Sequence, residues 1–144
     1  MRTLRILSGL LVAVAMLAVA RPAAAQGFKV IANEGVSETE LSKDVAAKLF
    51  LKQAAKFPSG TAAKPVDLNK ASAVRAEFST AVLGRPVTAV ETYWQQQIFS
   101  GKDVPPPAKA SDDDVIAFVK GTPGAIGYVS AAAATAGVKV IAIK

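Results

Sequence analysis

The chain has 144 residues, with 17 Lys or Arg, 11 Asp or Glu, and neither Cys nor His. The lack of Cys and His excludes disulfides, thiolate nucleophiles, histidine-based triads and the usual zinc sites, and we expect no enzyme, no cofactor and no metal. A formal net charge of +6, without a stripe of basic residues between aromatic ones, does not indicate a nucleic-acid-binding protein.

The first 25 residues have the layout of a secretory signal peptide. Two arginines precede an apolar run over residues 6–20, and Ala23-Ala24-Ala25 supplies small residues for cleavage. The run is shorter than the roughly 20 apolar residues that span a bilayer. We therefore predict a cleaved signal peptide over residues 1–25 and a soluble periplasmic domain over residues 26–144.

Beyond residue 26, short apolar runs alternate with segments whose apolar residues recur at helical spacing, which indicates an α/β fold. In chain order, the expected elements are a strand at 28–32, a helix ending near Leu51, a strand at 63–68, a helix from Ser72 to Gly84, a helix opening at a Thr88–Glu91 capping box, a proline-rich loop at 101–107, a helix from Ser111 to Gly121, an extended segment at 125–129, a helical turn at 131–136 and a strand at 138–143. The expected buried faces of the two middle helices are Val74, Phe78, Ala81 and Val82, and then Val90, Trp94 and Ile98.

The first helix has two candidate starts. Ser37 and Glu40 match a capping box, in which each side chain bonds a free backbone N–H of the first turn. Ser42 is also a suitable N-cap, and Asp44 then lies in the first turn, where a negative charge complements the helix dipole. The sequence leaves both starts open.

The acidic run Asp112-Asp113-Asp114 follows Ser111 directly and precedes an apolar helical segment. Acidic residues are common in the first turn of a helix because they complement its dipole. We interpret the run as part of a helix cap; a metal site is the alternative.

Three segments resemble, in the same order, segments of the phosphate-binding proteins of bacterial uptake transporters (PstS-like), which have the class II periplasmic solute-binding fold. Residues 41–51 resemble that family's helix ending in isoleucine-phenylalanine-leucine-glycine-lysine, and residues 66–78 lie where the family has a strand followed by its anion loop. Residues 119–128, VKGTPGAIGY, match the family's threonine-proline-glycine segment almost letter for letter. The resemblance covers residues 28–128 and implies a single periplasmic-binding-protein-like lobe, with a small mixed sheet flanked by helices.

The best-matched segment contains Thr122, Pro123, Gly124 and Gly127. Proline fixes one φ angle, and glycine either takes a positive φ or lets another part of the chain pass close by. We interpret these residues as a turn that defines the fold rather than as a ligand loop.

The chain departs from the family at two places. Lys52 stands where the family's helix continues into glycine, and residues 67–73 lack the arginine and the Gly-Ser-Gly-Thr sequence of the family's anion loop. Ser72, with the backbone N–H of Ala73 and the charge of Arg75, supplies a partial anion site there. The alternative is a capped helix with a solvated arginine.

Full-length members of this family have two lobes that enclose the ligand, and this chain resembles one lobe. An open half-site lacks the enclosure that gives pockets their affinity. The resemblance implies an exported module of an ABC uptake transporter that binds phosphate or another small oxyanion weakly, as a homodimer or in an assembly with another exported protein. The alternative is an interaction domain that docks on a permease or envelope partner without binding solute.

Overall fold

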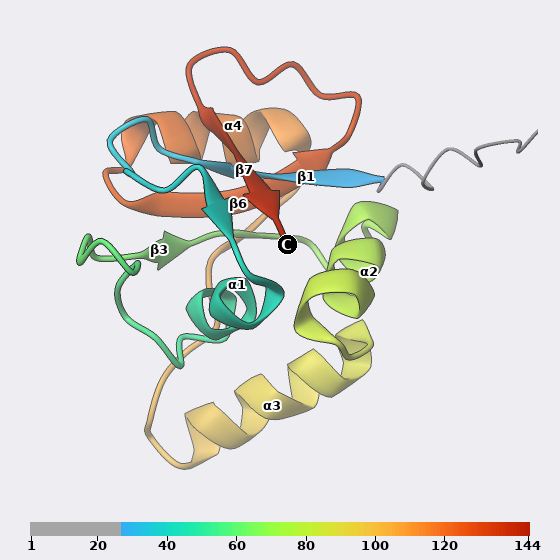
Figure 1. Cartoon of the computed structure of the whole chain (residues 1–144). Coiled ribbons are helices and arrows are strands. Elements are labelled where there is room, and N and C mark those ends of the chain that lie inside the picture. The colour runs from blue at the N-terminus through green and yellow to red at the C-terminus, as the bar shows by residue number, and fades with distance from the viewer. Residues whose placement is uncertain (1–26) are drawn as a thin grey trace, which may run out of the picture.

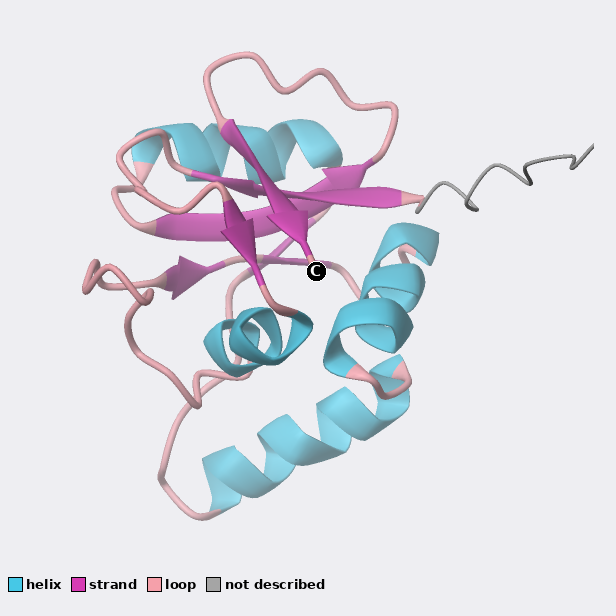
Figure 2. Ribbon diagram, in the orientation of Figure 1, coloured by secondary structure: helices cyan, strands magenta, loops and turns pink. Residues whose placement is uncertain are grey.

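A mixed sheet of five strands lies at the centre of the molecule, with helices on both faces (Figures 1 and 2). The computed structural model describes residues 27–144, so the predicted signal peptide lies outside the described residues. The expected α/β lobe with a small mixed sheet is confirmed. The elements, in chain order, are β1 (Phe28–Ala32), β2 (Glu40–Leu41), α1 (Lys43–Phe50), β3 (Lys64–Pro65), β4 (Asp67–Leu68), α2 (Ala73–Phe78), the π-helical turn η1 (Ser79–Leu83), α3 (Val87–Phe99), β5 (Ala108–Lys109), α4 (Asp112–Gly121), β6 (Ala125–Ser130) and β7 (Lys139–Ile143).

β1 is the central strand and runs antiparallel to both of its neighbours, β6 and β7. Two-residue strands form the edges of the sheet: β2 pairs in parallel with β7, and β3 in parallel with β6. Figure 1 shows α4 on one face of the sheet and α1 and α2 on the other. Because both faces are covered, β1 and β6 are apolar almost throughout, as their sequences FKVIA and AIGYVS show.

An aromatic cluster fills the space between the sheet and helices α1 and α2. The rings of Phe78 and Tyr128 stack with their centroids 3.8 Å apart, and Phe28 and Phe50 pack edge-on against Phe78. All four side chains are buried. Since ring stacking adds to the free energy of burial, this cluster holds α2 against β6.

A tight turn joins α4 to β6. The Ala125 N–H donates to the Thr122 carbonyl at 3.1 Å, and Gly124 has a φ angle of +78°. Pro123 followed by a glycine with positive φ is the arrangement of a type II turn. A Cβ atom on Gly124 would lie 2.1 Å from the Ala62 carbonyl oxygen, so the turn leaves no room for a side chain there.

Serine N-caps set the starts of three helices. The Ser42 hydroxyl accepts a hydrogen bond from the Val45 N–H at 3.2 Å, which decides the start of α1 in favour of Ser42 over Ser37. Ser72 and Ser111 cap α2 and α4 in the same way. These three starts follow from the sequence because a hydroxyl satisfies an N–H that the helix cannot.

Two expectations for α3 are wrong. The capping box of Thr88 and Glu91 is absent, because α3 begins at Val87, directly after Pro86. Pro86 has an extended backbone and no side-chain cap, so the helix starts earlier than predicted. Ile98 is 52 % exposed, because the small core cluster beneath α3 ends one turn before it.

Two other segments also differ from expectation. The predicted strand 63–68 is two strands in two sheets: the Val66 N–H still donates to the Ile126 carbonyl of β6, whereas the Asp67 N–H donates to the Pro107 carbonyl. The predicted helical turn 131–136 is a mostly exposed loop. That loop has to carry the chain from β6 to β7, the two neighbours of β1.

Three glycines near the α4–β6 turn allow a matched test of close packing. A Cβ on Gly127 would lie 2.6 Å from Val66 Cγ1 and 2.9 Å from Val115 Cγ1, whereas one on Gly121 meets nothing within 4 Å. We expect Gly127→Ala and Gly124→Ala each to lower the free energy of unfolding by about 1–3 kcal/mol. Gly121→Ala, inside α4, should be neutral or stabilising by up to about 1 kcal/mol. Urea denaturation of the three variants checks this order, and a Gly127→Ala variant as stable as Gly121→Ala would contradict it.

Lys52 follows Leu51, the C-cap of α1, at the position where the phosphate-binding proteins have a glycine. Lys52, which replaces that glycine, has a φ angle of +54°, a left-handed conformation that costs a non-glycine residue about 1 kcal/mol. We expect Lys52→Gly to be more stable than Lys52→Ala by roughly this amount. Both variants lose the half-exposed ion pair with Asp103 (3.5 Å), so their difference isolates the backbone effect. Equal midpoints of denaturation for the two variants would rule this explanation out.

Candidate functional site

A cavity of about 490 Å³ lies between the β4–α2 segment, α3 and the proline-rich loop that leads into β5. The β4–β5 pairing brings that loop close, because the Asp67 and Asn69 N–H groups donate to the Pro107 and Lys109 carbonyls. The lining residues are Asp67, Asn69, Lys70, Arg75, Glu91, Trp94, Gln95, Ile98, Pro105, Pro106 and Ala108. They combine charged, amide and apolar side chains, as ligand pockets commonly do.

Asp67 is the buried carboxylate of this cavity, with 8 % of its surface exposed. It accepts hydrogen bonds from the Tyr128 hydroxyl and the Leu68 N–H, and its other oxygen lies 3.5 Å from Arg75 Nη2. Burial raises the pKa of Asp67 against the lowering effects of Arg75 and these bonds. Burial, together with the Asp67 charge, also raises the pKa of Tyr128. The hydroxyl therefore stays protonated and donates its hydrogen bond to Asp67.

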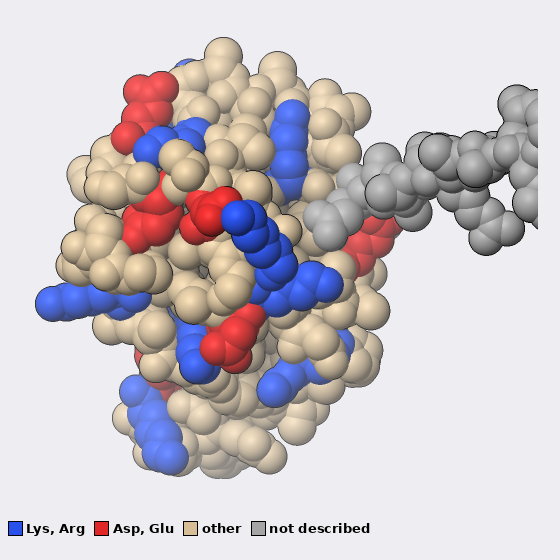
Figure 3. Space-filling model, in the orientation of Figure 1, with Lys and Arg blue, Asp and Glu red and all other residues tan. Residues whose placement is uncertain are grey.

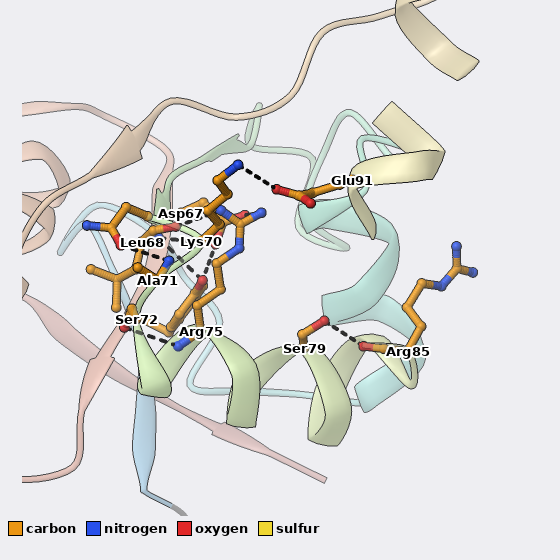
Figure 4. A network of polar contacts seen from close by, with 11 residues as sticks. Asp67, Leu68, Lys70, Ala71, Ser72, Arg75, Ser79, Arg85 and Glu91 are labelled. Carbon is orange, nitrogen blue, oxygen red and sulfur yellow. Dashed lines mark hydrogen bonds and ion pairs between the residues drawn. The ribbon is translucent and has the colours of Figure 1, made fainter. Parts of the chain in front are cut away.

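Arg75 lines the cavity but is already engaged. Its Nη1 donates to the Leu68 carbonyl at 2.8 Å, its Nη2 pairs with Asp67, and only 12 % of its side chain is exposed. Figure 4 shows this guanidinium between Leu68, Asp67 and Lys70. The expectation of a solvated arginine at this position therefore does not hold.

Of the three residues predicted to bind an anion, the structure brings only Arg75 into the cavity. The Ser72 hydroxyl accepts from the Arg75 N–H at 3.3 Å as the N-cap of α2, and neither Ser72 nor Ala73 lines the cavity. The turn residues are also elsewhere: none of Thr122, Pro123, Gly124 and Gly127 belongs to the lining.

Lys70 is the exposed cation of the cavity. Its side chain is 76 % exposed, and its Nζ lies 3.8 Å from Glu91 Oε1 of α3 (Figure 4). An exposed pair of this kind contributes about 0–1 kcal/mol, so Lys70 can leave Glu91 for another partner. With Arg75 and Asp67, the lining carries two positive and two negative groups. Elsewhere too, basic and acidic side chains are interspersed on the face drawn in Figure 3.

The α3 and loop side of the cavity carries its large apolar residues beside the polar Glu91 and Gln95. These apolar residues are Trp94 and Ile98 from α3 and Pro105 and Pro106 from the loop. Trp94 is 4 % exposed and packs with Leu51 in a small core cluster that anchors α3. This apolar surface is therefore partly fixed by the core and partly open at Ile98.

Sequence analysis missed the link between Asp67 and Tyr128. Both residues lay inside matched segments, but their 61-residue separation hides the contact. The available signal was an acidic residue between the apolar Val66 and Leu68, since a buried carboxylate needs donors.

Residues 27–144 contain no group of three or more acidic side chains placed to hold a metal ion. Asp112 instead accepts a hydrogen bond from the Ser130 N–H, and Ser111 caps Asp114, in agreement with the capping interpretation. Within the same residues, no helix is long and apolar enough to cross a bilayer.

Solved structures share this fold. An ABC-type phosphate transport receptor from Vibrio cholerae superposes with a TM-score of 0.63 at 15 % identity, over 81 % of this chain and 46 % of that one. PstS from Borrelia burgdorferi gives 0.63 at 11 % identity, over 82 % and 47 %. This chain has the fold of one lobe of a phosphate-transporter substrate-binding protein. It spans about half the length of these structures, and no protein-family description and no curated protein matches it.

The raised pKa of Asp67 predicts a pH-dependent stability. An unfolded aspartate has a pKa of about 3.9, so above about pH 4 the folded protein binds this proton more tightly than the unfolded chain does. The contribution of Asp67 to stability is therefore present at low pH and is lost as pH rises through its raised pKa. Asp67→Asn removes this dependence.

Denaturation of both proteins between about pH 4 and 7 tests this, because all other groups cancel in the difference. We expect the stability of the wild type to fall relative to Asp67→Asn as pH rises. A relative gain would mean that pairing with Arg75 outweighs burial.

Proposed function

We propose that this protein is a solute-binding module without catalytic activity that holds a small anion in the cavity between β4, α2 and α3. One observation carries the proposal: a fold shared with phosphate-transporter substrate-binding structures has a cavity at the start of α2 that is lined by Lys70 and Arg75. Phosphate or another small oxyanion is the first solute to test, because one neighbouring structure is a phosphate transport receptor.

Binding by the single chain should be weak. The cavity is open where Lys70 and Ile98 are exposed, and both cations of the lining already face carboxylates. Enclosure by a second copy or by another exported protein would remove water and strengthen the charge interactions. We therefore propose that tight binding needs an assembly, with an ABC permease as its membrane partner.

The alternative function is docking without solute. It is favoured by three exposed apolar side chains at the end of α3 and in the following loop, Ile98, Phe99 and Val104, of which Phe99 is 93 % exposed. Apolar surface beside a cavity is a common feature of protein contact sites. If no solute binds and Phe99→Ser abolishes recovery with an envelope partner, the alternative replaces the first proposal.

Phosphate should stabilise the protein made from the full 144-residue sequence. At ten times Kd the ligand adds about 1.4 kcal/mol to the free energy of unfolding, seen as a rise in Tm. Lys70→Ala should reduce this rise at a given phosphate concentration, because it removes the exposed cation of the lining. Lys64→Ala, which removes an exposed lysine outside the cavity, is the matched control.

Arg75→Ala is a poor choice for this test because it also leaves Asp67 without its counter-charge. An equal response to phosphate in Lys70→Ala and wild type would place the anion elsewhere. No response to phosphate, sulfate or molybdate in any of the proteins would end the anion-binding proposal.

The N-terminal sequence of the protein, produced in a bacterium from the full 144 residues, tests whether the chain is exported and cleaved. We expect Edman sequencing of the periplasmic fraction to begin at Gln26, because Ala23-Ala24-Ala25 supplies the small residues of a cleavage site. Protein that keeps residues 1–25 and fractionates with membranes would contradict the predicted cleavage.

A further inference from the structure

The size of the cavity does not match an inorganic oxyanion. At about 490 Å³ it lies in the range of pockets that enclose organic ligands of drug size, roughly 300–1,000 Å³. Phosphate has only five non-hydrogen atoms and would touch one end of this space. Much of the lining would then face water.

The two sides of the cavity also differ in chemistry. Lys70 and Arg75 lie on the β4–α2 side, whereas Trp94 and Ile98 of α3 and the loop prolines form an apolar surface beside Glu91 and Gln95 on the other side. Ile98 is the open part of that side, with 52 % of its surface exposed at the rim. An apolar group of a ligand resting here would leave water, and that transfer favours binding.

The charges of the lining favour a ligand with a single negative charge. Asp67 holds Arg75 at 3.5 Å, and Glu91 faces Lys70 at 3.8 Å, so an anion that approaches the cations also meets two carboxylates. Because the lining has no net charge, it offsets little of the hydration that an anion loses, and that loss is larger for a dianion than for a monoanion. Affinity that the charges do not supply has to come from apolar contact.

We propose that the solute of this cavity is an organic anion, with one carboxylate-like group near Lys70 and Arg75 and an aliphatic or aromatic group against Trp94 and Ile98. This inference rests on the proposed function, because it assigns the class of ligand to the same cavity. It goes beyond that function by making the apolar surface, and not only the cations, the determinant of specificity.

The fluorescence of Trp94 measures ligand binding directly, since Trp94 is the only tryptophan of the chain and lines the cavity. Its fluorescence in the full-chain protein is titrated with inorganic phosphate, acetate, cyclohexanecarboxylate and cyclohexylamine. Acetate and cyclohexanecarboxylate share the charged group and differ in the apolar one. We expect cyclohexanecarboxylate to bind at least about tenfold more tightly than acetate or phosphate, and cyclohexylamine not to bind.

Two variants assign the contacts. Ile98→Ser should weaken cyclohexanecarboxylate several-fold and leave acetate unchanged, and Lys70→Ala should weaken both. Val140→Ser is the matched control, because Val140 is similarly exposed at 47 % but lies in β7, outside the cavity. Ile98 and Val140 are both exposed, so neither change should prevent folding.

The outcomes separate this inference from the proposed function. If phosphate binds as tightly as cyclohexanecarboxylate, or Ile98→Ser acts like Val140→Ser, the organic-anion inference is wrong and anion binding stands. If cyclohexylamine binds as well as the carboxylate, the assignment of a negative ligand is wrong. If no anion changes the fluorescence of Trp94 or the Tm, both proposals fail.

Discussion

The hydrogen bond from Tyr128 to Asp67 joins the hydrophobic core to the cavity. The ring of Tyr128 stacks on Phe78 in the middle of the protein, while its hydroxyl donates to a carboxylate in the cavity wall. Asp67 in turn holds the guanidinium of Arg75, one turn into α2. A buried carboxylate without such donors would be costly, so the contacts of Asp67 with Tyr128 and Arg75 help to fix β6, β4 and α2 relative to one another.

The two cations of the cavity, Arg75 and Lys70, have different roles. Arg75 has its donors occupied by Leu68 and Asp67, and it belongs to the scaffold as much as to the lining. Lys70 is held only by an exposed pair with Glu91 and is free to meet a ligand. Of the residues predicted to bind an anion, Ser72 uses its hydroxyl as the cap of α2, and only Arg75 lines the cavity.

The features of the fold that depend on local chemistry could be predicted from the sequence. Those that depend on contacts between distant segments could not. Serine caps and the apolar runs of β1 and β6 act within a few residues, so their outcome follows from the sequence. The split of strand 63–68 depends on a carbonyl some 40 residues away, at Pro107, and the exposure of Ile98 depends on where a neighbouring core cluster ends. The cavity lies where such distant segments meet, which explains why, of the residues predicted to bind an anion, only Arg75 lines it.

The edges of the sheet and the end of α3 offer a partner very different surfaces. The sheet is bounded by two-residue strands, one of which contains Pro65, and such edges are poor templates for pairing with another chain. The exposed apolar residues Ile98, Phe99 and Val104 instead lie beside the cavity, and Ile98 belongs to both. A partner seated on these residues would also cover the opening, so docking and solute binding are not competing uses of this surface. Contact with the partner would supply the enclosure that the single lobe lacks.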